Sequence, residues 1–216
     1  MADRRIGGKG GGSDPGPGKG GKGGGFVAAA VLVGAVAVAG GSLPPSGGPR
    51  AAPSGKNISA AKNGARKGDA DQAWRRMGMR TLKKKAKQDL TCVASSFGQV
   101  RGFLVRHPCR SLERVLFAIG DDRGNVVVVS VAWVGFRTRR DAREFQRLED
   151  VHGTGDITPL AGALLDLADI RFTGRHYRSR PAGSTTVVAE TEPATGRVGE
   201  EMLGALADVA VLLPHP

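Results

Sequence analysis

Residues 112–134, LERVLFAIGDDRGNVVVVSVAWV, predict a β-hairpin at the centre of the fold. Two runs rich in apolar and β-branched residues, 112–119 and 126–134, are typical of strands. The residues between them, Asp-Asp-Arg-Gly-Asn, are of the types that form tight turns. The second run is apolar almost throughout, which indicates a strand that is covered on both faces and lies inside a sheet.

Weaker patterns on either side extend this hairpin into a folded domain. A second hairpin is expected from strands at 171–180 and 184–191, joined by Pro-Ala-Gly. We therefore expect an α+β domain over residues 92–216, with a mainly antiparallel sheet of about four strands packed by helices. The stretches with apolar residues at helical spacing are 96–106, 138–153, 159–168 and 195–213.

Charge is distributed very unevenly along the 216 residues. The net charge of +12 arises entirely from the first 91 residues, whereas residues 92–216 contain fifteen Arg, fifteen acidic residues and no Lys. A single basic globular domain would not divide in this way. The pattern favours a neutral folded domain that follows a cationic leader and tether.

The first 43 residues have the composition of a leader. Residues 1–25 are mostly Gly with scattered Lys, which predicts a disordered head. Residues 26–43 begin with the uncharged run FVAAAVLVGAVAVAG, intermediate in length between a signal-peptide core and a transmembrane helix. We expect a single-pass membrane anchor; secretion after cleavage near Ala39 is the alternative. The basic residues before the run favour a cytoplasmic N-terminus and a domain outside the cytoplasm.

The segment between the apolar run and the domain is basic. Residues 44–69 are rich in Pro, Gly, Ser and Lys and predict a flexible linker. Residues 70–91 predict a basic amphipathic helix, which near a membrane would bind anionic headgroups. Docking of its apolar side on the domain and binding of nucleic acid are the alternatives. The basic residues expected at the membrane surface are Arg75, Arg76, Arg80, Lys83, Lys84, Lys85 and Lys87.

The chain has two cysteines, Cys92 and Cys109, which flank the first predicted helix of the domain. Outside the cytoplasm such a pair is more often a disulfide than a metal site or a redox couple, so we predict a Cys92–Cys109 bridge. Two buried free thiols are the alternative. Zinc would need two further ligands at a recognisable spacing, and the sequence offers none.

Several stretches of the domain together form a recognisable pattern. The stretches are CVASSFGQVRGFLVRHPCRSLERVL at 92–116, WVGF at 133–136, GTGD at 153–156, FTGRHYRSR at 172–180 and AVLLP at 210–214. In these stretches the chain resembles a recurring domain of membrane-anchored proteins from actinobacteria, over residues 74–214. The resemblance implies a location at the membrane and the extent of the domain, and it implies no catalytic residues.

Candidate functional residues are few. His152, Asp156 and His176 are the residues that could share acid–base work in a cell-envelope enzyme. Nucleophile-elbow and metal-ligand spacings are missing, so we expect no cofactor and no metal. We predict a membrane-tethered, extracytoplasmic binding or assembly domain that is not an enzyme, with the lipid bilayer and an envelope component as partners. The alternatives are the envelope enzyme and a cytosolic nucleic-acid-binding protein that acts through residues 75–87.

Overall fold

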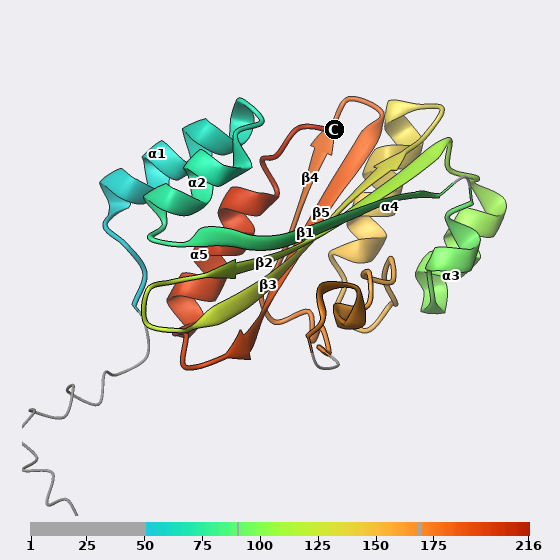
Figure 1. Ribbon diagram of the computed structural model, residues 1–216. Coiled ribbons are helices and arrows are strands. Elements are labelled where there is room, and N and C mark those ends of the chain that lie inside the picture. Colours follow the sequence, from blue (N-terminus) through green and yellow to red (C-terminus); the bar gives the residue numbers. More distant parts are fainter. Residues whose placement is uncertain (1–50, 90, 168–169) are drawn as a thin grey trace, which may run out of the picture. The chain divides into compact units, whose positions relative to one another are not determined.

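The computed structural model describes residues 51–89, 91–167 and 170–216 (Figure 1). The predicted head, the predicted apolar segment at 26–43 and the first residues of the predicted linker lie outside the described residues. Within the described part of the chain, no helix is both long and apolar enough to cross a membrane.

The domain is α+β and contains an antiparallel sheet of five strands in the order β1-β2-β3-β5-β4. The predicted central hairpin is confirmed, with Ser111 opposite Gly135 and Gly120 opposite Val126. At its turn, the carboxylate of Asp121 accepts hydrogen bonds from the backbone N–H groups of Arg123 and Asn125. The strands are β1 (Arg80–Asp89), β2 (Ser111–Gly120), β3 (Val126–Gly135), β4 (Tyr177–Ala182) and β5 (Thr185–Thr195).

The sequence predicted a basic helix over residues 70–91, but strand β1 lies within this segment, so that prediction is wrong. Only α2 (Ala70–Arg76) is helical; it is capped by Asp69, which accepts a hydrogen bond from the Gln72 N–H group. Gly78, at φ 68°, then turns the chain into β1. The edge of β2 offers a row of backbone hydrogen-bonding groups, and pairing with them outweighs the helix propensity of the Lys-rich segment.

The predicted flexible linker at 44–69 also needs correction, because α1 (Gly55–Arg66) lies inside it. Ala61 and Ala65 of this helix are completely buried, and α1 packs against α2 and α5 (Glu200–Ala210). The folded unit therefore does not begin at residue 92. The two N-terminal helices and β1 belong to it.

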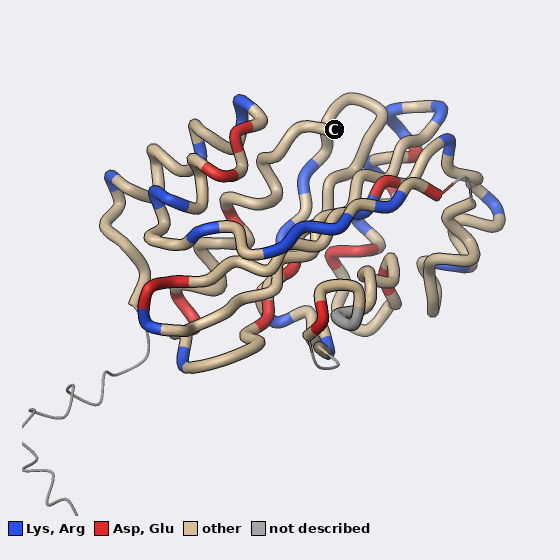
Figure 2. The backbone as a smooth tube through the Cα atoms, in the orientation of Figure 1, with Lys and Arg blue, Asp and Glu red and all other residues tan. Residues whose placement is uncertain are grey.

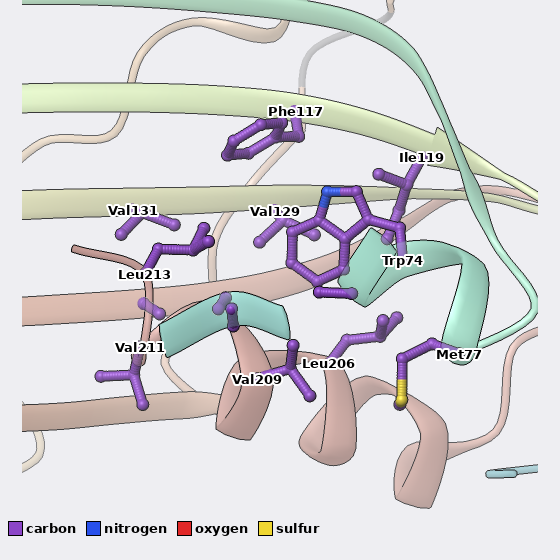
Figure 3. Packing of buried hydrophobic residues seen from close by; sticks show 14 of the residues in the cluster. Trp74, Met77, Phe117, Ile119, Val129, Val131, Leu206, Val209, Val211 and Leu213 are labelled. Atoms are coloured by element: carbon purple, nitrogen blue, oxygen red, sulfur yellow. The ribbon is translucent and has the colours of Figure 1, made fainter. Parts of the chain in front are cut away.

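One face of the sheet is covered by α1, α2 and α5, and the indole of Trp74 lies in the middle of this layer (Figure 3). The Trp74 ring contacts the ring of Phe117 edge-on, at 5.8 Å between centroids. On β3 the odd-numbered residues face this layer, and the Trp133 side chain donates a hydrogen bond from Nε1 to the Leu213 carbonyl at 3.1 Å. This cluster is the larger part of the core.

The other face is covered by α3 (Gly98–Arg106) and α4 (Arg139–Glu149), which pack with Leu112, Val134 and Val188. The helices α3, α4 and α5 confirm the helices predicted at 96–106, 138–153 and 195–213, and each is shorter than predicted. The predicted helix at 159–168 is only the 3₁₀ turn η2 (Gly162–Leu165); a second such turn, η1 (Val93–Ser95), precedes α3. Much of this face is thus covered by irregular chain rather than by helix.

The predicted bridge between Cys92 and Cys109 is confirmed: the two residues form a disulfide, with their Cα atoms 6.1 Å apart. Cys92 is buried in the same cluster as Leu112. Phe97 and Val105, which are close to the bridge in sequence, are 52% and 62% exposed. The disulfide ties the segment before α3 to the segment before β2.

Replacement of Trp74 by Ala tests whether α2 is part of the domain core. Trp74 is fully buried, so we expect W74A to lower the free energy of unfolding by about 3–5 kcal/mol in urea denaturation. The control is L82A, because Leu82 lies in β1, only eight positions after Trp74, but is 45% exposed. This substitution should lower the free energy of unfolding much less than W74A does. Equal losses in the two variants would show that α2 does not pack as described.

Candidate functional site

A pocket of about 630 Å³ opens on the face of the sheet that carries α3 and α4. It lies between the end of α4, the loop that follows it, residues 170–174, and the side chains of Tyr177 and Glu190 on neighbouring strands. Much of its wall is apolar, and four acidic side chains reach it from α4, the loop and β5. The apolar wall includes Phe97, Leu160, Ile170 and Phe172; the acidic residues are Glu149, Asp150, Asp156 and Glu190.

The loop that carries Asp156 is held in place by backbone hydrogen bonds to the segment after Cys92. The Phe97 N–H group donates to the Asp156 carbonyl at 3.1 Å, and the Thr158 N–H group donates to the Ser95 carbonyl at 2.8 Å. Gly155 has φ +104°, and a Cβ atom there would collide with the Phe97 carbonyl. Because the same segment is anchored by the disulfide, the loop is attached to a constrained support.

Glu149 is the most unusual side chain of the pocket. It is the last residue of α4 and is only 6% exposed, and among the described residues it has no basic partner and no N–H or hydroxyl donor of normal hydrogen-bond geometry. Its carboxyl group instead interacts with the carboxyl group of Asp156. Burial, followed by the neighbouring Asp156 and Glu190, raises the pKa of Glu149 far above its usual value, so that Glu149 stays protonated at neutral pH. Burial also raises the pKa of Asp156.

Glu190 and Tyr177 face each other across β5 and β4 and point to the same side of the sheet. Burial, and then the charges of Asp156 and Glu192, raise the pKa of Glu190 to about 8. Burial also raises the pKa of Tyr177, so its hydroxyl stays protonated and donates to Asp150 at 3.2 Å. These side chains form a polar wall opposite the apolar one.

The titratable groups around the pocket are predominantly acidic. Its four carboxyl groups are accompanied, among the described residues, by a single Arg, Arg171, and by His152. The C-terminus of α4, where the helix dipole is negative, also lies at this pocket. The site is thus prepared to receive hydrogen-bond donors or positive charge.

The structure brings together only two of the three residues predicted for an enzyme. His152 and Asp156 both line the pocket. His176 lies one residue before Tyr177 and points to the opposite face of the sheet, where its Nε2 atom lies 2.7 Å from the Glu200 carboxylate at the start of α5. The acid–base group suggested by the sequence is therefore not assembled.

The basic residues predicted for a membrane-surface helix lie on two elements. Arg75 and Arg76 end α2, whereas the other five lie along the exposed edge strand β1, as the row of blue segments in Figure 2 shows. Two of the β1 lysines have acidic partners, Lys83 with Asp166 at 2.6 Å and Lys87 with Asp89 at 3.0 Å. Side chains of β1 alternate between the two faces of the sheet, so this is a basic edge rather than one basic helical face.

Sequence reasoning missed Glu149, Tyr177 and Glu190. The only signal was at Glu190, an acidic residue that follows the apolar run Val-Val-Ala in the predicted strand 184–191. Glu149 resembles any charged residue at the end of an amphipathic helix, because only the tertiary fold places the following loop and the middle of β5 beside it. Tyr177 and Glu190 are joined only by the register of β4 and β5.

In the described part of the chain, no group of three or more His, Cys, Asp or Glu side chains is arranged to hold a metal ion. Comparison of the chain with protein-family models, with curated proteins and with solved structures finds no match.

The raised pKa of Glu190 predicts a pH-dependent stability. Between pH 4.5 and about 8 the folded chain keeps a proton on Glu190 that the unfolded chain has released, so the free energy of unfolding falls as the pH rises through this range. Glu149 and Asp156 act in the same direction. In thermal melts, E190Q should therefore lose less stability than the wild type between pH 5.5 and pH 8.5.

The matched control is E201Q, which removes the same charge from an exposed position in the first turn of α5. Its melting temperature should follow that of the wild type across the pH range. If E190Q and the wild type lose equal stability from pH 5.5 to pH 8.5, Glu190 is not protonated in the folded chain.

Proposed function

We propose that this chain is a membrane-tethered, extracytoplasmic binding domain that holds a small molecule in the acid-lined pocket and does not act as an enzyme. The observation that carries the proposal is the carboxyl group of Glu149, which is buried at the pocket beside Asp156 and has no basic partner among the described residues. A buried acidic group without a basic partner costs free energy, and a ligand that supplies the partner recovers part of this cost.

The form of the pocket supports the same function. A volume of about 630 Å³ suits a small organic molecule, and a mostly apolar wall with a few convergent polar groups is the usual composition of such sites. The hydrogen bonds between the Asp156 loop and residues 95–99 hold one wall in place before a ligand arrives. A preformed wall lowers the entropic cost of binding.

The proposed location rests on two features. The first is the predicted membrane segment at 26–43. The second is the Cys92–Cys109 disulfide, a bond that is stable in oxidising compartments and rare in the cytosol. In this arrangement the basic edge formed by Arg80, Lys83, Lys84, Lys85 and Lys87 is a surface for anionic headgroups, each basic residue near the membrane contributing about 1 kcal/mol.

Occupation of the pocket can be tested by NMR with a library of small fragments that includes cationic, neutral and anionic members. We expect at least one fragment to shift the amide signals of pocket residues selectively. V151W places a bulky side chain on the pocket wall and should abolish these shifts; V105W makes the same change on the exposed surface of α3 and should preserve them. Shifts that are spread over the surface, or that survive V151W, would contradict the proposed site.

The location can be tested by the redox state of the cysteines in cells. Peptide mapping without reductant, on protein recovered from the cell envelope after alkylation, should yield Cys92 and Cys109 in one linked peptide pair. Recovery of both residues as alkylated thiols would contradict a domain outside the cytoplasm.

A further inference from the structure

We propose that the ligand of this pocket is an organic cation, an ammonium group on an apolar body, bound by the carboxylates of Glu149, Asp156 and Glu190. The inference rests on the proposed binding function and specifies the chemistry of the ligand. Three observations support it: the convergence of the carboxyl groups, the sign of the surrounding charge, and the composition of the opposite wall.

The three carboxyl groups reach the pocket from different parts of the chain: the end of α4, the following loop and the middle of β5. The three carboxyl groups line the same pocket, and Asp156 contributes to the raised pKa of both Glu149 and Glu190. Glu149 and Glu190 are each only 6% exposed, and Glu149 has no basic partner among the described residues. An ammonium group brings three N–H donors to such a set of acceptors.

The electrostatic surroundings select the sign of the ligand. Four carboxyl groups and the negative end of the α4 dipole face the pocket, against Arg171 and His152. An anion would oppose the ionisation of these acidic groups, and each group that loses its proton would repel the anion in a poorly solvated space. A neutral ligand would fill the apolar part but would supply no positive charge to the carboxyl groups as they ionise.

The opposite wall selects an organic cation rather than a metal ion. Leu160 is 5% exposed, and Ile170 and Phe172 pack on the buried cluster formed by Leu116, Ala118 and Val128. These side chains offer apolar surface to a ligand and no metal-coordinating atoms. The described residues also contain no group of three or more ligating side chains placed for a metal. A hydrocarbon chain or ring attached to the ammonium group fits this wall.

Binding of a cation is coupled to proton release. Burial raises the pKa values of all three carboxyl groups, and for Glu149 and Glu190 the neighbouring acidic groups raise them further, so Glu149 and Glu190 keep their protons at neutral pH. The groups around Glu190 are Tyr177 on β4, Glu192 on β5, and Asp156, His152 and Arg171 on the loops. A bound ammonium group would lower the carboxyl pKa values again, so protons should leave as the cation enters.

Isothermal titration calorimetry with three probes of one carbon skeleton tests the inference: hexylamine, hexan-1-ol and hexanoate, each at pH 7.5. Hexylamine should bind at least about tenfold more tightly than hexan-1-ol, because charge-assisted hydrogen bonds are stronger than neutral ones. Hexanoate should not bind. Titration of hexylamine in two buffers with different ionisation enthalpies should show net proton release, which a merely apolar site would not produce.

Two variants and a metal titration complete the test. E190Q should weaken hexylamine binding at least about tenfold and leave hexan-1-ol binding unchanged, whereas E201Q should change neither. Calcium chloride should not displace hexylamine. Displacement by calcium, or failure of hexylamine to bind, would overturn the inference.

Failure of this inference can be distinguished from failure of the proposed function. If hexan-1-ol or hexanoate binds as tightly as hexylamine and V151W abolishes that binding, the pocket is a ligand site but the preference for a cation is wrong. If no fragment of any charge shifts the pocket residues in the NMR experiment, the binding function itself is wrong.

Discussion

The double-sided burial of β3 is the constraint on which the rest of the structure depends. Every residue from Val127 to Gly135 is buried, so this strand needs neighbours on both edges and a covering layer on both faces. On one face the requirement is met by α1, α2 and α5, which pack closely around Trp74. The strand order, with β3 at the centre, follows from the same requirement.

The second face is covered less uniformly, and this difference creates the pocket. The helices α3 and α4 pack over one end of the sheet, while η2 and irregular chain cover the part near Leu116 and Val128. Irregular chain cannot fill space as evenly as a helix can. The pocket lies where the end of α4 gives way to this loop, and β5 contributes Glu190 to it because alternate strand residues face the same side.

The central hairpin, the second hairpin and the disulfide could be predicted from sequence because each depends on local patterns: alternation, turn residues and the presence of only two cysteines.

That β1 is a strand and not a helix could not be predicted in this way. Its Lys-rich sequence fits a helix or a strand, and the unpaired edge of β2 decides between them. The helix α1 was missed because its apolar side consists mainly of small residues, such as Ala61 and Ala65. The carboxyl cluster forms only in the tertiary structure, because its members are separated by up to 41 positions in the chain, from Glu149 to Glu190. Local sequence patterns therefore could not predict it.

The buried acids connect stability with function. Near neutral pH the empty domain keeps Glu190 protonated, and proton loss as the pH rises removes stability because the charge is not compensated. A group of this kind is costly in a purely structural role, since an apolar side chain of similar size would cover the sheet without this penalty. The disulfide lies on the same side of the molecule, and the segment that follows Cys92 supports the loop of Asp156 through backbone hydrogen bonds. The covalent constraint thus strengthens the part of the fold that the buried acids weaken. This is the arrangement expected when a site retains buried ionisable groups for a ligand to bind.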